Sequence, residues 1–192
     1  LYLQITRGVA KRDHPYPLGV KPTIFCMVAP FKRVDEVRET GLRTVSLDDI
    51  RWHRCDIKSV SLLGNVMARK AAVEAGVDDV IQFRDGILSE ASAANIWVVR
   101  DGVLLAPVRD HHVLAGVRYG VLEELAQACG IPFQSRAITR GEVAAADELM
   151  LTAATKEVLP IVEHDGRPVG TGRPGPIYRA LRAAYDQAIA AL

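Results

Sequence analysis

The sequence predicts an α+β fold with mostly antiparallel sheets and flanking helices. Three observations support this: short β-rich runs outnumber helical stretches, Asp-Gly pairs join consecutive runs as in hairpins, and strands and helices do not alternate strictly as in a βαβ protein. The chain has 192 residues, of which 49% are hydrophobic and 24% charged, so it can bury a core and is too apolar for wholesale disorder. We therefore expect an ordered globular protein.

The N-terminal part is expected to contribute two strands. Residues 2–6 alternate in side-chain character, and residues 23–28 form a β-rich apolar run after a polar loop. Residues 30–39 then bring a proline and mixed charges without periodicity, which indicates a domain boundary. This boundary would separate residues 1–30 from residues 31–192. Because the chain starts in a strand-like run without methionine, we expect it to begin inside a longer protein.

The middle of the chain is expected to form a helix followed by a meander. A strand at residues 44–47 precedes a helix over 62–75, where apolar spacing and Ala, Lys and Glu content are typical of a helix and Gly76 is a stop signal. The pairs Asp85-Gly86 and Asp101-Gly102 are strong hairpin signals. They separate four predicted strands, at residues 80–83, 87–89, 95–99 and 103–106.

The C-terminal third mixes the two kinds of element. The predicted elements are a helix over 116–129, a strand over 133–138, a short helix over 140–145, a strand over 148–152 and a hairpin over 161–169 that turns at Asp165-Gly166. A final helix places one apolar face toward the core, formed by Ile177, Leu181, Tyr185, Ile189 and Leu192.

Charge and cysteine content exclude several classes of function. Lys and Arg number 24 against 23 Asp and Glu, so the net charge of +1 gives no reason to bind nucleic acid or anionic lipid. Charge-free stretches such as residues 22–31 and 59–68 are half the length of a membrane span. The cysteines, Cys26, Cys55 and Cys129, are odd in number and far apart, which predicts reduced thiols in a cytoplasm, without disulfides or a zinc site.

Two further patterns are interpreted as structural. Residues 170–175 fit the dinucleotide fingerprint G-x-G-x-x-G, but the chain ends after the next helix without the second parallel strand and acidic residue of that motif, so we predict a loop. His111 and His112 are adjacent and could not face one ligand together on a regular element. With His53 and His164 interpreted as surface or satisfied polar residues, no metal site is predicted.

Lys58 and Glu90 are the first candidates for chemistry. Lys58 is a lone amine among apolar neighbours between a strand and a helix, where desolvation favours the neutral, nucleophilic form; the alternative is a surface lysine. Glu90 opens the small-residue run Glu-Ala-Ser-Ala-Ala-Asn-Ile-Trp. An acid buried there needs a cationic partner, and a pyridinium nitrogen would serve. The alternative is a solvated acid at a hairpin end.

Four ordered segments resemble the signatures of class IV pyridoxal-phosphate enzymes. They are Arg-Cys-Asp-Ile-Lys-Ser at 54–59, Leu-Ser-Glu-Ala-Ser-Ala-Ala-Asn at 88–95, Leu-Ala-Gly-Val-Arg at 114–118 and Leu-Thr-Ala-Ala-Thr-Lys-Glu at 151–157. The resemblance implies a fold type IV pseudo-barrel with pyridoxal 5'-phosphate as cofactor. It also implies that Lys58 joins the cofactor as a Schiff base, that Glu90 pairs with the pyridine nitrogen and that Leu114 packs on the ring.

The same resemblance implies a cradle for the cofactor phosphate, since a helix start offers free N–H groups. It assigns this role to Gly116, Val117 and Arg118, where Arg118 replaces the common Thr. In the last signature Ala153 and Ala154 replace a common Ser/Thr pair, which leaves backbone amides and the Thr155 hydroxyl as contacts. The second signature adds two more residues to the cofactor-binding set, Ser92 and Asn95. The phosphate-binding arginine of the family is expected upstream of Leu1. The resemblance also implies that residues 1–30 are the end of a small N-terminal domain, most of which is not in this sequence, and that residues 31–192 are the large cofactor-binding domain.

Within the family, the N-terminal segment resembles the D-amino-acid aminotransferases. Arg12 and His14 match an Arg-x-His pair that holds the substrate carboxylate, and both point to one side of an extended chain. The Arg-Trp-His-Arg-Cys run at 51–55 is also typical of that group. The resemblance implies ping-pong transamination between a D-amino acid such as D-alanine and a 2-oxo acid such as 2-oxoglutarate, in a cytoplasmic homodimer. The alternatives are a class IV lyase, a branched-chain L-aminotransferase and a non-catalytic fragment.

Overall fold

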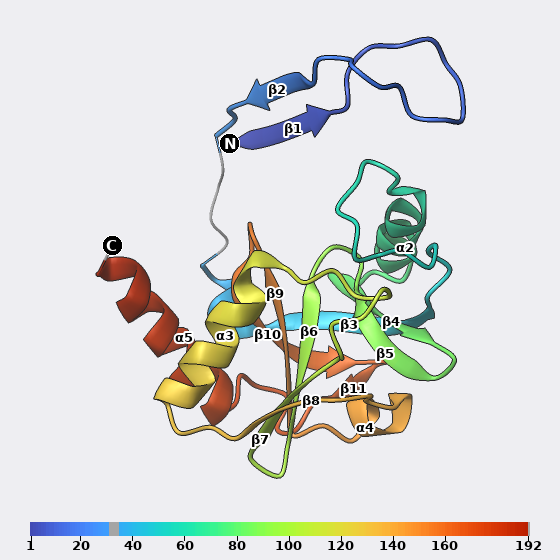
Figure 1. Cartoon of the computed structure of the whole chain (residues 1–192). Coiled ribbons are helices and arrows are strands. Elements are labelled where there is room, and N and C mark those ends of the chain that lie inside the picture. The colour runs from blue at the N-terminus through green and yellow to red at the C-terminus, as the bar shows by residue number, and fades with distance from the viewer. Residues whose placement is uncertain (31–34, 192) are drawn as a thin grey trace. The chain divides into compact units, whose positions relative to one another are not determined.

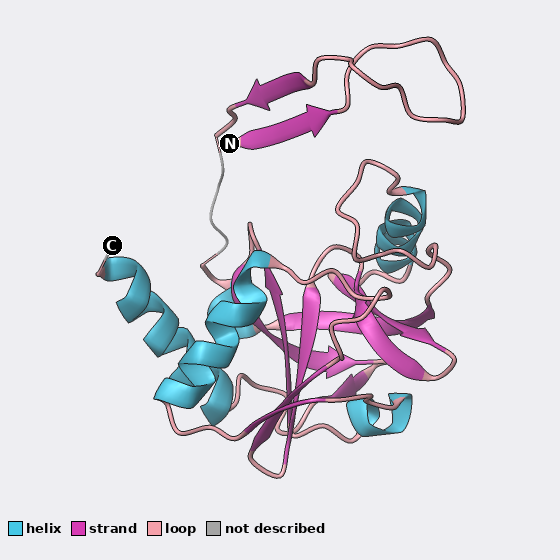
Figure 2. Ribbon diagram, viewed as in Figure 1, coloured by secondary structure: helices cyan, strands magenta, loops and turns pink. Residues whose placement is uncertain are grey.

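The computed structural model describes residues 1–30 and 35–191 (Figures 1 and 2). The chain forms two compact units, Leu1–Val34 and Asp35–Leu192. The predicted boundary, which assigns residue 31 onward to the large domain, falls at residues 31–34, outside the described part.

The first unit is a hairpin of two antiparallel strands, β1 (Tyr2–Thr6) and β2 (Thr23–Met27). Tyr2 lies opposite Met27 and Thr6 opposite Thr23. Both strands agree with the sequence prediction, although β2 ends one residue earlier. No side chain of either strand is buried, and Leu3 remains 56% exposed. The hairpin therefore has no core of its own, as expected for two strands alone.

The second unit is an α+β structure with nine strands and five helices in its described part. Its elements are α1 (Val37–Thr40), β3 (Leu42–Asp48), α2 (Leu63–Glu74), β4 (Asp79–Arg84), β5 (Ile87–Ala91), β6 (Asn95–Arg100), β7 (Val103–Ala106), α3 (Val117–Ala128), β8 (Phe133–Ser135), α4 (Arg140–Ala144), β9 (Glu148–Ala153), β10 (Glu157–His164), β11 (Arg167–Pro168) and α5 (Pro176–Ala190). None of these helices combines the length and the hydropathy needed to cross a bilayer.

The strands form one mixed sheet, which curls into the half-barrel visible in Figure 2. The strand order is β5-β4-β3-β10-β9-β6-β7-β8, with β11 paired to β10. Three neighbouring pairs are parallel, β3–β4, β3–β10 and β7–β8, and the others are antiparallel. The predicted α+β pseudo-barrel with mostly antiparallel pairing is confirmed.

The Asp-Gly pairs form tight turns as the sequence predicts. Asp85, Asp101 and Asp165 have φ values of 50–51°, and each precedes a glycine that also has positive φ. Two successive residues with positive φ give the turn whose twist suits a two-residue hairpin. These turns fix the register of β4–β5, β6–β7 and β10–β11.

The sheet buries apolar side chains on both faces. Along β6, Ile96 and Val98 belong to a cluster on the inner face, while Trp97 and Val99 pack with α3 and α5 on the outer face. The Trp97 ring lies 4.7 Å from the ring of Tyr119 on α3. Figure 1 shows α3 and α5 side by side along this face. Strand β6 is therefore held on both sides, and its first residue reaches the candidate site described below.

Several predicted bounds differ from the structure. Strand β10 begins at Glu157 rather than at residue 161, because Pro160, which disfavours a strand interior, is accommodated opposite Met150. Helix α1 lies in a stretch that the sequence shows only as mixed charge. In α5, Leu181 and Tyr185 are buried but Ile189 is 51% exposed, so the predicted apolar face is shorter. Its last predicted member, Leu192, lies outside the described residues.

Candidate active site

Lys58 and Glu90 line the same cavity. Lys58 lies on the loop between β3 and α2, and Glu90 lies on β5. The cavity measures about 80 Å³ and is lined by Arg51, Trp52, Cys55, Ile57, Lys58, Ser59, Ser61, Leu62, Asn65, Glu90 and Leu114. An adjoining cavity of about 480 Å³ shares five of these residues, namely Arg51, Trp52, Ser61, Leu62 and Asn65. The structure thus brings together the amine and the acid that the motifs single out.

Glu90 is buried, with 6% of its surface exposed, and both carboxylate oxygens have partners. The Arg51 guanidinium donates to Oε1, and the Leu114 N–H donates to Oε2 at 3.1 Å. Burial raises the pKa of the Glu90 carboxyl above its ordinary value, while the Arg51 charge opposes that rise. The carboxylate is therefore held rigidly, and its remaining lone pairs can accept a hydrogen bond from a ligand.

Arg51 itself is fixed by a second carboxylate that sequence reasoning missed. Asp49 accepts from Arg51 Nε at 2.9 Å and from Nη2 at 2.8 Å, a bidentate pair. Although burial acts to raise it, the pKa of Asp49 lies well below its usual range because Arg51 donates to the ionised form. Gly64 at the start of α2 makes room, since a Cβ there would lie 2.8 Å from Arg51 Cγ. The cation expected beside Glu90 is thus partly supplied by the protein.

Asn95 and Leu114 connect Glu90 to the loop before α3. Asn95 Nδ2 donates to the Leu114 carbonyl at 2.8 Å and lies 3.5 Å from Glu90 Oε2. Gly116 approaches so closely that a Cβ would lie 2.3 Å from Asn95 Oδ1. A glycine is therefore required for this close packing, and the loop places Leu114 at the cavity wall.

The two segments assigned to the phosphate lie on either side of Asn95. Helix α3 begins after Gly116, and within the described residues no side chain caps this start. Asn95 pairs with Thr152 across β6 and β9, so the turn containing Ala153, Ala154 and Thr155 follows directly. Helix α3 also contacts strand β9. Both segments thus lie near Asn95, and the uncapped start of α3 offers free backbone N–H groups.

The side chains of three other residues predicted to bind the cofactor do not line the cavity at Lys58. Val117 is exposed at the first position of α3. Arg118 turns toward α5, where its guanidinium carbon lies 5.5 Å from the Tyr185 ring centre and its buried Nε has no hydrogen-bond partner. Ser92 donates to Asp79 Oδ1 at 2.6 Å and does not line the cavity. Arg118 and Ser92 thus support neighbouring elements.

Arg12 and His14 belong to the first unit. Both side chains are exposed there, and the His14 N–H donates to Asp13 Oδ1 at 2.8 Å. Their assignment to the substrate carboxylate stays a prediction.

The residues around the cavity fit pyridoxal 5'-phosphate. An amine can join its aldehyde, a buried carboxylate can hold its ring nitrogen, an apolar Leu114 side chain can cover the ring and an uncapped helix start can receive its phosphate. Because these features come from three separate segments of the chain, at Lys58, at Glu90 and at residues 114–118, the fit depends on the fold rather than on one motif.

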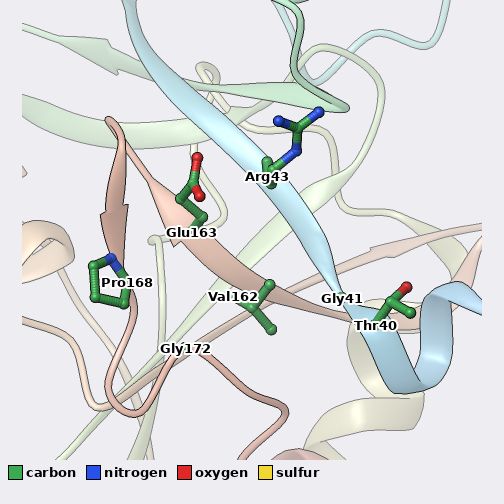
Figure 3. A pocket seen from close by; sticks show the side chains of 7 residues that line it. All are labelled: Thr40, Gly41, Arg43, Val162, Glu163, Pro168 and Gly172. Atoms are coloured by element: carbon green, nitrogen blue, oxygen red, sulfur yellow. The ribbon is translucent and has the colours of Figure 1, made fainter.

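A separate cavity of about 360 Å³ lies between α1, β3, β10 and the following loop (Figure 3). It is lined by Thr40, Gly41, Arg43, Val162, Glu163, Pro168 and Gly172, none of which lines the cavity at Lys58 or the cavity adjoining it. Arg43 Nη2 donates a hydrogen bond to the Gly76 carbonyl at 2.8 Å. This cavity holds none of the residues predicted to carry chemistry, although it is larger than the one at Lys58.

Comparison with known proteins gives a family match. The family described as "Amino-transferase class IV" matches residues 1–164. The D-alanine aminotransferase of Bacillus licheniformis is 34% identical over 189 residues, which is 98% of this chain and 67% of that protein. The D-alanine aminotransferase of Staphylococcus aureus (strain COL) is 36% identical over 190 residues, with the same coverage of 98% and 67%.

Solved structures show the same fold. The branched-chain aminotransferase from Thermoproteus uzoniensis with norvaline has a TM-score of 0.80 at 29% identity, covering 88% of this chain and 58% of that one. The branched-chain amino acid aminotransferase from Thermobaculum terrenum in its PLP-form has a TM-score of 0.76 at 24% identity, covering 82% and 54%. The chain thus spans little more than half the length of these solved relatives.

Proposed function

Because the chain belongs to the class IV aminotransferases, we propose that it transfers an amino group between an amino acid and a 2-oxo acid with pyridoxal 5'-phosphate as cofactor. The observation that carries this proposal is the shared cavity of Lys58 and Glu90. The amine and the buried acid come from separate segments, and an enzyme of this class needs them at two positions of one flat ring.

Each residue has a task that follows from its surroundings. The cofactor, when bound, supplies an aldehyde for covalent attachment and a ring that accepts electrons. Lys58 would hold the cofactor through its amine, and the same amine, when free, would move the proton at the substrate Cα. Glu90 would accept a hydrogen bond from the ring nitrogen, and Arg51 keeps the Glu90 carboxylate oriented and favours its charged form. Leu114 would cover the ring, since its backbone is fixed to Glu90 and Asn95.

We propose D-amino acids, with D-alanine as donor and 2-oxoglutarate as acceptor. Two observations support this choice: the Arg12-x-His14 pair, whose guanidinium and imidazole suit a carboxylate, and the names of the matched D-alanine aminotransferases. The second candidate is a branched-chain L-aminotransferase, which the name of the Thermoproteus uzoniensis structure favours. A class IV lyase and a non-catalytic fragment have no comparable support.

The test is a stereochemical assay on the full chain loaded with cofactor. Incubation with D-alanine and 2-oxoglutarate should give D-glutamate, measured by chiral chromatography, while L-leucine should give little L-glutamate. Lys58→Ala should abolish turnover, whereas Lys70→Ala, an exposed helix lysine paired with Glu74, should not. Turnover of L-leucine alone would favour the second candidate. Turnover in Lys58→Ala equal to that of the unaltered chain would contradict the assignment.

We also propose that the protein acts as a homodimer in the cytoplasm on small molecules only. This follows the family resemblance and the low net charge of +1. Sedimentation of the protein at several concentrations tests the assembly: a monomer at every concentration would contradict it.

A further inference from the structure

We propose that His53, His111 and His112 form a binding site for one divalent transition-metal ion, for which zinc is the reference. One ring nitrogen from each histidine lies within 4.8 Å of the other two. The site would join the loop that carries Lys58 to the loop that carries Leu114.

The loop conformation removes the reason why the sequence predicted no metal site. His111 and His112 lie between β7 and α3, outside any regular element, so adjacent side chains need not point to opposite sides. Their ring centres are 3.9 Å apart. His53 comes from the β3–α2 loop, and its ring centre is 5.3 Å from that of His112. Three imidazoles from two loops thus converge at one place.

The nitrogen positions suit a metal ion. His53 Nδ1 and His112 Nε2 are 3.1 Å apart. Tetrahedral zinc with Zn–N bonds of about 2.0–2.1 Å separates its nitrogen ligands by about 3.3 Å. Asp110 Oδ2 lies 3.8 Å from His112 Nδ1, on the opposite edge of that ring. A carboxylate there favours the proton on Nδ1 and leaves the Nε2 lone pair for a metal.

Hydrogen bonds to two backbone carbonyls hold the two loops together before any ion binds. The Cys55 N–H donates to the His111 carbonyl at 2.8 Å, and Arg51 Nη2 donates to the His112 carbonyl at 3.3 Å.

Arg84 is the feature that opposes an ion. Its Nη1 lies 3.1 Å from His53 Nδ1, so an ion must displace that contact or use the other ring nitrogen of His53. Arg84 retains other partners, because Nη2 donates to the Arg51 carbonyl at 2.8 Å and pairs with Asp49. We therefore expect only ions with high affinity for imidazole to bind, such as Zn²⁺, Ni²⁺ and Cu²⁺, and not Mg²⁺ or Ca²⁺.

Calorimetric titration of Zn²⁺ into the full, untagged chain loaded with cofactor tests the site. We expect one ion per chain, with at least tenfold weaker binding in His53→Gln and in His112→Gln. His164→Gln is the matched control, since His164 on β10 hydrogen-bonds Thr44 and Ser46 and is not one of the three histidines, and it should bind zinc as the unaltered chain does. Asp110→Asn should weaken binding by about 10- to 100-fold through the orientation of His112. Circular dichroism shows whether each variant is folded.

Cobalt absorption identifies the ligand atoms. Co²⁺ bound to the three histidines should show ligand-field bands without a thiolate charge-transfer band. A thiolate band would assign the ion to Cys55 or another cysteine and overturn the proposal. Equal zinc affinity in His53→Gln, His112→Gln and the unaltered chain would also overturn it, as would an absence of zinc binding. Hydrogen exchange should slow in residues 51–58 and 110–116 when zinc binds, because the ion would join both loops.

Discussion

The starts of helices α3 and α5 look alike in the sequence and differ in the structure. Each helix follows a glycine in extended conformation, Gly116 or Gly175. At α5 the Glu148 carboxylate accepts from the N–H groups of Ile177 and Tyr178 at 2.9 and 2.8 Å. At α3 no side chain of the described residues caps the helix. The protein supplies one helix start with its own anion, whereas the other has no side-chain acceptor among the described residues.

The Glu148 carboxylate at the start of α5 argues against a dinucleotide site at the glycine-rich run of residues 170–175. A Cβ at Gly175 would lie 2.2 Å from Glu148 Cδ, so the glycine is needed to admit the glutamate. A phosphate at this helix start would meet a buried carboxylate, which repels it. A helix start is a candidate anion site only when the chain has not already supplied the anion.

Among these predictions, the largest change in free energy is expected from Glu148→Ala, which should lower the stability of the fold. The change leaves two N–H groups of α5 without their charged acceptor, so we expect a loss of about 3 kcal/mol in the free energy of unfolding. Urea unfolding followed by circular dichroism measures it. Glu124→Ala, on the exposed side of α3, should change stability by less than about 0.5 kcal/mol. Equal stability of the two variants would remove the distinction between the two helix starts.

The second effect is on cofactor affinity. In Gly116→Ala the new Cβ collides with Asn95 and disturbs the uncapped start of α3, so binding of pyridoxal 5'-phosphate should weaken about tenfold, or about 1.4 kcal/mol. Gly120→Ala is the matched control inside the same helix, where a Cβ meets nothing within 4 Å. It should stabilise the helix without weakening binding. If both variants bind the cofactor equally, the phosphate does not lie at this helix start.

The smallest predicted effect is on stability at the start of helix α4. This helix start is capped by neighbouring residues of the chain itself. Thr139 and Glu142 form a capping box, and Arg136 pairs with Glu142 at 2.7 Å. Hydrogen bonds from Arg136 and then from Thr139 lower the pKa of Glu142 from 4.5 to about 2. Because the folded pKa is depressed, the stabilisation is complete above about 4.5 and disappears as the pH falls toward 2.

Melting temperatures of the unaltered chain and of Glu142→Gln, measured between pH 6 and pH 2, test this dependence. The unaltered chain should melt slightly higher at pH 6, and the two curves should converge near pH 2. A constant difference over this range would show that ionised Glu142 does not stabilise the cap.

Much of the fold could be predicted because local chemistry determines it. Asp85-Gly86 and Asp101-Gly102 specify hairpins through positive φ, and Gly76 follows the end of α2 as expected. Strand β10 was partly missed because its start, including Pro160, is stabilised by pairing with β9 rather than by its own sequence. Parallel pairing of β3 with β10 likewise depends on contacts between distant residues.

In the candidate site, too, residues in local motifs could be predicted, whereas residues placed by contacts between distant segments could not. Lys58, Glu90 and Leu114 could be found from motifs, and the structure brings them to one cavity. Arg51 and Asp49 were missed, because a salt bridge between buried groups follows from their spatial arrangement and from the space left by a glycine. A buried acid did signal a nearby cation, but the sequence did not show which residue supplies it.

The most direct test of the account is to locate the cofactor on the chain. The protein is incubated with pyridoxal 5'-phosphate, reduced with borohydride and digested, and the labelled lysine is identified by mass spectrometry. The account predicts a phosphopyridoxyl group on Lys58, and none on the Lys58→Ala variant. A label on Lys70 or Lys156, or equal labelling of both proteins, would contradict the assignment of Lys58 and with it the shared role of Glu90.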